Sequence, residues 1–257
     1  MDQSNQDNYV QSERSYFSSI EEYFNDSSSS YTEKMHAFPR FVPRQSISYL
    51  LARNEIFKEV VPLHGSIFDF GTYRGSSFFT WLQLSSIYEP YNHLRKIVGF
   101  DSFQGFSALG ENDHSAEGKD FKLKRQGEMV FHGGEEELQR GIALLDLNRP
   151  LGHVSKGQVV KGDLSDSFAA YLQEHQETII AMANFGLGLY SPTKEILSLM
   201  KPRLQNGSIL VFEDLNQAMW PGESKALFDV FGADEISLQR FPYCPHLSWM
   251  RVGGKRG

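Results

Sequence analysis

The sequence is poor in several features that would each define a class of protein. It has a single cysteine, Cys244, among 257 residues, so an internal disulfide and a multi-cysteine metal site are both excluded. No apolar run approaches the roughly 18 residues of a membrane-spanning helix. The formal net charge is −7, which argues against nucleic acid or an anionic membrane as the main partner. Because the N-terminus lacks a basic region followed by an apolar one, we expect a cytoplasmic protein.

The composition is that of a globular chain. Hydrophobic residues make up 40% of the sequence and aromatic residues 13%, which is enough to bury a full core in one large α/β domain. We expect residues 1–32, which are rich in Ser, Asn, Asp, Gln and Glu, to be a mobile extension, with a short amphipathic helix as the alternative. Residues 33–64 are expected to form a helical cap, and residues 65–257 the main domain, with a lid loop at residues 104–134.

Residues 65–77 have the pattern of a strand, a tight turn and a helix. An apolar run ends at Asp69, and Gly71 and Gly75 follow at a G-x-x-x-G spacing. The free N–H groups at the start of the helix favour an anionic group such as a carboxylate. The Gly-Lys-Ser/Thr ending of a phosphate-binding loop and the G-x-G-x-x-G of a dinucleotide site are both missing. An acid followed by G-x-x-x-G is typical of S-adenosylmethionine (SAM) dependent methyltransferases, and a plain turn packed through its glycines has the same pattern.

Three successive predicted strands end in an acid, namely Asp69, Asp101 and Asp163. Ligands of open α/β sheets gather at the carboxyl ends of the strands, so we expect Asp101 to bind ribose hydroxyls and Asp163 the adenine amino group. An NAD-linked oxidoreductase remains the alternative, and the missing third glycine counts against it. The predicted cofactor-binding residues are Asp69, Gly71, Thr72, Tyr73, Gly75, Ser76, Asp101, Ser102, Phe103, Gly162, Asp163 and Asn184.

The remaining apolar runs complete the predicted sheet. Residues 178–184 and 208–212 read as a fourth and a fifth strand, each followed by a helix. The runs around residues 236–241 and 247–252 read as an antiparallel pair. The sequence therefore predicts an α/β fold: a single doubly wound, Rossmann-like domain of the SAM-methyltransferase type, with a mostly parallel seven-stranded sheet and a C-terminal antiparallel hairpin.

Seven segments, in unbroken order between about residues 38 and 252, resemble one family, the TylF-like (macrocin-type) SAM-dependent O-methyltransferases. These segments are residues 41–45, 69–75, 99–106, 160–163, 190–194, 212–216 and 220–223. The resemblance implies SAM as the cofactor and a small-molecule acceptor, such as a sugar or a natural-product intermediate. It also implies a homodimer or a larger homo-oligomer.

The chain departs from this family at its metal motif. Members typically read Asp-x-Asp-x-Tyr where this chain has Gly186 and Gly188 in place of both acids. In the family, magnesium orients vicinal hydroxyls and lowers their pKa, and the resemblance implies Glu213 and Asp214 as its remaining ligands here. A site that has lost two carboxylates binds magnesium much more weakly.

Three hypotheses follow for the function. In the first, the chain is an active O-methyltransferase with Glu213 or Asp214 as metal ligand or general base, and with His114 or His132 of the lid as an alternative base. In the second, it is a metal-independent enzyme that acts on an easier acceptor such as an amine or phenol, and its two glycines enlarge the acceptor pocket. In the third, it binds SAM without catalysis and acts as a partner or regulatory subunit.

Overall fold

The computed structural model describes residues 11–107, 109–115 and 126–253. Residues 108 and 116–125 of the predicted lid loop lie outside this description, as do the first ten residues of the predicted extension. The chain divides into two compact units, Met1–Leu51 and Ala52–Gly257, which we describe separately.

The first unit is helical. Its elements are α1 (Gln11–Asp26), α2 (Tyr31–His36), the 3-10 turn η2 (Phe38–Arg40) and the start of α3 (Arg44–Val60). Helix α2 begins with a capping box, in which the Ser30 side chain accepts from the Glu33 N–H and the Glu33 carboxylate accepts from the Ser30 N–H. The rings of Tyr23 and Phe41 stack with centroids 5.6 Å apart. The helix given as the alternative for residues 1–32 is thus present as α1, and the mobility of this segment remains a prediction.

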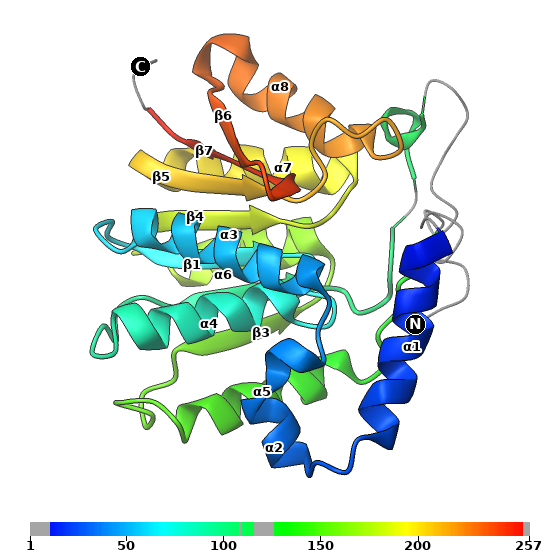
Figure 1. The fold of residues 1–257 in the computed structure, drawn as a ribbon. Coiled ribbons are helices and arrows are strands. Elements are labelled where there is room, and N and C mark those ends of the chain that lie inside the picture. The colour runs from blue at the N-terminus through cyan, green and yellow to red at the C-terminus, as the bar shows by residue number, and fades with distance from the viewer. Residues whose placement is uncertain (1–10, 108, 116–125, 254–257) are drawn as a thin grey trace. The chain divides into compact units, whose positions relative to one another are not determined.

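The second unit is built on a seven-stranded sheet. The strands are β1 (Ser66–Phe70), β2 (Ile97–Asp101), β3 (Gly157–Lys161), β4 (Ile180–Phe185), β5 (Leu204–Phe212), β6 (Leu238–Phe241) and β7 (Cys244–Arg251). Their order is β3-β2-β1-β4-β5-β7-β6; the first five are parallel, and β7 is antiparallel to both of its neighbours (Figure 1). The predicted fold is confirmed, except that the last strand begins at Cys244 rather than near residue 247.

Helices cover both faces of this sheet. They are α4 (Ser76–Tyr88), α5 (Gly134–Asp146), α6 (Leu164–Glu174), α7 (Tyr190–Met200) and α8 (Pro221–Glu235), with short 3-10 turns η3 (Glu111–Asp113) and η4 (Lys201–Arg203). Helices α4 and α5 lie on one face and α6 and α7 on the other, while α8 packs against α7 (Figure 1). Within the described part of the chain, no helix is long and apolar enough to cross a membrane. The strand order reverses between β1 and β4, which is where sheets of this kind bind ligands.

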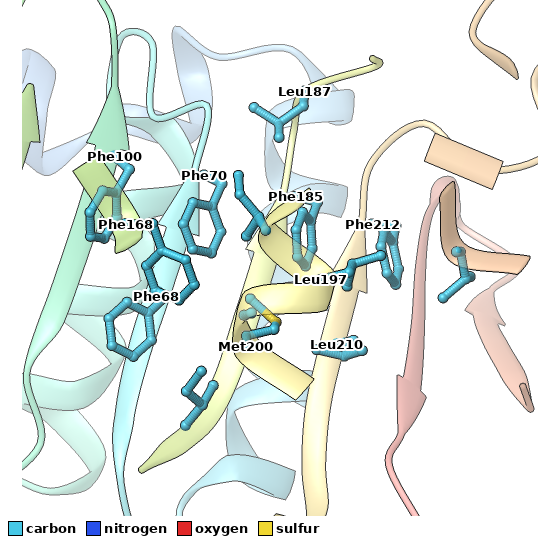
Figure 2. Packing of buried hydrophobic residues seen from close by; sticks show 14 of the residues in the cluster. Phe68, Phe70, Phe100, Phe168, Phe185, Leu187, Leu197, Met200, Leu210 and Phe212 are labelled. Carbon is cyan, nitrogen blue, oxygen red and sulfur yellow. The ribbon is translucent and has the colours of Figure 1, made fainter. Parts of the chain in front are cut away.

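A row of four phenyl rings crosses the sheet near the carboxyl ends of its strands. Phe100, Phe70, Phe185 and Phe212 come from β2, β1, β4 and β5, and neighbouring rings stack with centroids 5.2, 5.4 and 5.0 Å apart (Figure 2). The ring of Phe168, on α6, meets Phe70 edge-on at 4.9 Å. Because side chains alternate along a strand, the residues next to these phenylalanines point to the opposite face, under α4.

We predict that Phe185→Ala lowers the free energy of unfolding by about 3–5 kcal/mol, because it removes two ring contacts and leaves a cavity in the middle of the row. Urea unfolding followed by circular dichroism measures this change. Phe228→Ala is the matched control, since Phe228 is 52% exposed and its loss should change stability by less than about 1 kcal/mol. Equal losses in the two variants would contradict a core centred on the phenyl row.

Candidate active site

A cleft opens at the carboxyl ends of the parallel strands. It is lined by Gly71, Tyr73, Asp101, Ser102, Gly105, Phe106, Ser107, Met129, Asp163, Leu164, Gly186, Leu187, Leu189 and Pro192. The loops after β1 and β4 pass so close that a Cβ on Gly71 would lie 2.5 Å from the carbonyl oxygen of Gly186. Gly71 has a φ of 80°, so both its conformation and its surroundings require glycine.

Asp101 faces the cleft from the end of β2. Its Oδ2 accepts from the Tyr73 N–H at 2.6 Å, and its Oδ1 accepts from the Phe103 N–H at 2.7 Å. Both donors have left-handed backbones, with φ of 46° for Tyr73 and 55° for Phe103, which are strained for residues other than glycine. Burial raises the pKa of Asp101, and the bonds from these two N–H groups oppose the rise. The loops after β1 and β2 are therefore held in place around this carboxylate.

The cleft gathers only part of the predicted cofactor set. Five predicted residues line it: Gly71, Tyr73, Asp101, Ser102 and Asp163. The described lining residues do not include Asp69, Thr72, Gly75, Ser76, Phe103, Gly162 or Asn184. Sequence reasoning missed the apolar part of the wall, including Phe106, Met129 and Leu164. The sequence indicated these residues only through their positions: Phe106 and Met129 lie in the predicted lid loop, and Leu164 directly follows Asp163.

Asp69 was expected to face the ligand, and in the structure its side chain is completely buried instead. It accepts from Ser77 Oγ at 3.0 Å and from Asn184 Nδ2 at 2.9 Å. Side chains alternate between the two faces of the sheet along β1, so Asp69 points to the face packed by α4. Ser77 of α4 contacts it there. Asn184 is buried as well, and its Oδ1 has no hydrogen-bond partner among the described residues.

A buried arginine joins this network. Asn184 Nδ2 also donates to Glu213 Oε1 at 3.2 Å, and Arg53 forms an ion pair with the same oxygen at 2.9 Å. The Arg53 guanidinium also donates to Ser76 Oγ at 3.3 Å. Sequence reasoning missed Arg53; the available signal was its spacing, three positions before Ile56, which puts an arginine on the apolar side of α3.

Glu223 links the loop after β4 to the loop after β5. It is fully buried; its Oε1 accepts from the N–H groups of Leu187 and Gly188 at 2.8 and 3.0 Å, and its Oε2 accepts from the Asp214 N–H at 3.3 Å. Burial, and then the Asp214 carboxylate, raise the pKa of Glu223 well above its ordinary value. Sequence reasoning named Glu223 only as part of the segment 220–223, and not as a site residue.

The expectation that both glycines enlarge an acceptor pocket is wrong for Gly188. A Cβ on Gly188 would lie 2.4 Å from the ring of Trp220, which fills this space, and the φ of Gly188 is 63°. The Trp220 ring also packs against Phe106 of the predicted lid loop, with ring centroids 5.5 Å apart. At Gly186 a Cβ would meet Glu213 at an ordinary contact distance of 3.7 Å.

The predicted catalytic groups differ in their surroundings. His114 and His132 are exposed, whereas Glu213 and Asp214 are half-buried. None of these four residues is among the described residues that line the cleft. Asp214 Oδ1 accepts from Gln217 Nε2 at 3.3 Å, and the same nitrogen lies 3.2 Å from His246 Nδ1. His246, which sequence reasoning did not single out, therefore lies near Asp214, because β7 runs antiparallel alongside β5.

The donor set at the end of β5 does not fit a divalent cation. In the described part of the chain, no group of three or more His, Cys, Asp or Glu side chains could hold a metal ion. Glu213 already shares one oxygen between a guanidinium and an amide. The motif positions that would add carboxylates, Gly186 and Gly188, carry no side chain.

The cleft does fit SAM. A carboxylate at the end of the second strand suits the ribose diol, and apolar side chains flank it. Asn184 is buried outside the described cleft lining, and its amide oxygen has no partner among the described residues. Fold and site together define the class of the chain, a SAM-dependent methyltransferase.

Comparisons with known proteins identify the family. The chain is similar to the crystal structure of CalS11, a calicheamicin methyltransferase, with 31% identity, 96% of this chain and 95% of that chain covered, and a TM-score of 0.90. It is also similar to an apo structure of CalS11, described as a TDP-rhamnose 3'-O-methyltransferase of calicheamicin biosynthesis, with 29% identity, 96% of each chain and a TM-score of 0.82. The O-methyltransferase NovP, at 18% identity, 80% of each chain and a TM-score of 0.61, shares the fold.

No protein-family model matches the chain, and the search of curated proteins finds no match. The chain belongs to the TylF-like O-methyltransferases and transfers a methyl group from SAM to a hydroxyl. The comparisons favour this activity over a SAM-binding protein without catalysis.

We predict that Asp69→Asn removes a pH dependence of stability. Burial first, and then repulsion by Glu213, raise the pKa of Asp69 to about 7 in the folded state, against about 3.9 in an unfolded chain. A raised folded-state pKa gives a contribution to stability that is complete below about pH 4 and lost as the pH rises through about 7. Between pH 5 and pH 8 the wild type should therefore lose a few kcal/mol relative to the variant, as measured by urea unfolding.

Asp166→Asn serves as the control for this measurement, because Asp166 is an exposed aspartate at the start of α6. The difference between this control and the wild type should not change with pH. A stability difference between wild type and Asp69→Asn that is constant from pH 5 to pH 8 would contradict the prediction.

Proposed function

We propose that this enzyme methylates a hydroxyl of a nucleotide-linked deoxysugar. The observation that carries the proposal is the similarity, over 96% of each chain, to a structure described as a TDP-rhamnose 3'-O-methyltransferase. The 31% identity with a calicheamicin methyltransferase structure supports the same class of acceptor.

In this proposal the cofactor's nucleoside lies against the ends of β2 and β3. Each carboxylate oxygen of Asp101 accepts one hydrogen bond from a backbone N–H, and its remaining lone pairs accept from the two ribose hydroxyls. Asp163 caps α6 through Oδ1, which leaves Oδ2 to accept from the adenine amino group. The side chains of Leu164 and Met129 supply apolar contacts for the adenine ring.

The amino-acid end of the cofactor belongs at the loop after β1. The first N–H groups of α4 point out of the helix behind Gly75 and favour the carboxylate. The unpartnered Oδ1 of Asn184 is suited to accept from the ammonium group. Under this assignment the buried residues of the predicted cofactor set hold the loop in shape, and Asn184 is the member that binds directly.

Methyl transfer requires alignment and a base. When bound, SAM supplies an electrophilic methyl group on its sulfonium. The chain holds the acceptor oxygen in line with that methyl group and takes up the hydroxyl proton as the C–O bond forms and the S–C bond breaks. We assign the proton acceptor to the acidic pair Glu213 and Asp214, because it lies at the ligand-bearing edge of the sheet while His114 and His132 are exposed.

The test is methyl transfer to TDP-rhamnose with SAM, with the product identified by mass spectrometry. We expect a singly methylated sugar nucleotide. Asp101→Asn should raise the Kd for S-adenosylhomocysteine about 10- to 100-fold, since it weakens hydrogen bonds to a charged acceptor. The titration separates the two parts of the proposal: intact binding without product rejects this acceptor, and wild-type affinity in Asp101→Asn rejects the ribose assignment.

Asp166→Asn is again the matched control, because it removes an exposed aspartate outside the described cleft lining. Its affinity for S-adenosylhomocysteine should equal that of the wild type. Circular dichroism of both variants checks that the fold is retained.

We also propose that the enzyme works in the cytoplasm as a homodimer or a larger homo-oligomer. The family resemblance supports this assembly, and the use of SAM and sugar nucleotides supports this location. Sedimentation velocity should give a mass of at least two chains, and a monomer at micromolar concentration would contradict the assembly.

A further inference from the structure

We propose that the guanidinium of Arg53 replaces a divalent cation as the fixed positive charge beside Glu213, so that methyl transfer by this chain is independent of divalent metal. The inference rests on the proposed function and concerns the same site. Arg53 contacts a predicted catalytic carboxylate rather than the substrate, so we describe it as a positioning residue.

The guanidinium is held by several groups. Its Nη2 lies 2.9 Å from Glu213 Oε1, its Nη1 donates to Ser76 Oγ at 3.3 Å, and its Cζ lies 6.0 Å from the ring centroid of Trp81. The Arg53 side chain is 5% exposed. Arginine side chains keep their positive charge in proteins, so a buried guanidinium is a fixed cation.

This arrangement leaves little for a divalent cation to bind. Oε1 of Glu213 accepts from both Arg53 and Asn184, whereas magnesium needs direct oxygen contacts at about 2.0–2.1 Å. Asp69, a second acid of this network, uses its two oxygens for Ser77 and Asn184. Asp214, the other implied ligand, accepts from Gln217 Nε2 at 3.3 Å through Oδ1. A cation placed against Glu213 would also meet the like charge of Arg53.

The loop that carries the metal motif in the family has a different construction here. At Gly188 the Trp220 ring occupies the space of a side chain, and the Glu223 carboxylate binds the N–H of the same residue. An aspartate at position 188 would therefore have no room. At Gly186 a side chain fits, and an aspartate there would approach Glu213. The two glycines therefore differ: Gly188 has no space for a side chain, whereas Gly186 has space for one beside the Arg53–Glu213 ion pair.

The ion pair gives Glu213 one orientation. Its Oε1 is fixed by Arg53 and Asn184, while the side chain remains 24% exposed, so part of the carboxylate is accessible. The Arg53 guanidinium also places a positive charge 2.9 Å from this carboxylate, which is the group we assign to accept the proton of the acceptor hydroxyl. Arg53 thereby supplies a positive charge and orients Glu213. In the family, a metal ion supplies the positive charge at this position.

The experiment measures metal binding and activity separately. Manganese binding is followed by electron paramagnetic resonance, a measurement that needs no methyl acceptor. It is made on the wild type, Gly186→Asp and the double variant Arg53→Met/Gly186→Asp. We expect binding only in the double variant, where the guanidinium is gone and a carboxylate is added. Stoichiometric manganese binding by the wild type that Glu213→Gln abolishes would overturn the proposal.

Activity is then measured with TDP-rhamnose, with and without a chelator. We expect an unchanged kcat for the wild type in the chelator. Arg53→Met should lower kcat roughly 10- to 100-fold, the usual size for a residue that orients a functional ligand. Arg53→Lys should restore part of it, since it keeps the charge and loses the planar fork. Activity lost to the chelator and restored by magnesium would overturn the inference while leaving the methyltransferase assignment intact.

Arg251→Met is the matched control, because it removes an arginine from the Arg251–Glu59 ion pair, which lies outside the described cleft lining. Its kcat should equal that of the wild type. An equal fall in kcat in Arg53→Met and Arg251→Met would reduce Arg53 to a structural role and overturn the proposal. If TDP-rhamnose is not methylated under any condition, the acceptor proposal fails, and the manganese measurement still decides the inference.

Discussion

Side chains alternate between the two faces of β1, β4 and β5, and both the core and the active site depend on this period of two. On one face, Phe70, Phe185 and Phe212 stack in a row that fixes the strands beside one another. On the other face, Asp69 and Asn184 meet directly below the cleft. A shift of one residue in any of these strands would exchange the apolar and the polar sets, so the register of the sheet also fixes the site.

On the face of the sheet that carries Asp69 and Asn184, acidic side chains and one arginine lie close together with little exposure to solvent. Asp69 and Glu213 are two acids within one network, and Arg53 is the cation that faces them. Burial makes this arrangement sensitive, because an acid that loses its partners inside the protein either takes up a proton or destabilises the fold. The same network shapes the loop after β1, through the bonds from Ser76 to Arg53 and from Ser77 to Asp69. If the amino-acid end of the cofactor binds at this loop, as we propose, stability and cofactor binding are coupled in this part of the molecule.

The loops above the network are joined by backbone hydrogen bonds to single carboxylates. Asp101 collects the N–H groups of Tyr73 and Phe103, and Glu223 collects those of three residues in the loops after β4 and β5. Asp113, in the predicted lid loop, accepts from the N–H of Tyr190 at the start of α7. Each carboxylate thus ties together loops that are distant in sequence, and the cleft is formed where these loops meet.

The sequence by itself determined the α/β class and the strands with their acidic ends, because apolar periodicity is a local property. The spacing of Asp69, Gly71 and Gly75 left a plain turn and an NAD site open, and the resemblance of seven segments to one family implied SAM. The sequence also indicated that Asp101 and Asp163 belong to one edge, since parallel strands end together. Only the tertiary structure decided that Asp69 lies beneath the cleft, that Trp220 fills the space beside Gly188, and that Arg53 pairs with Glu213. Arg53 and Glu213 are 160 residues apart, and a contact of that kind is set by packing, which no local pattern encodes.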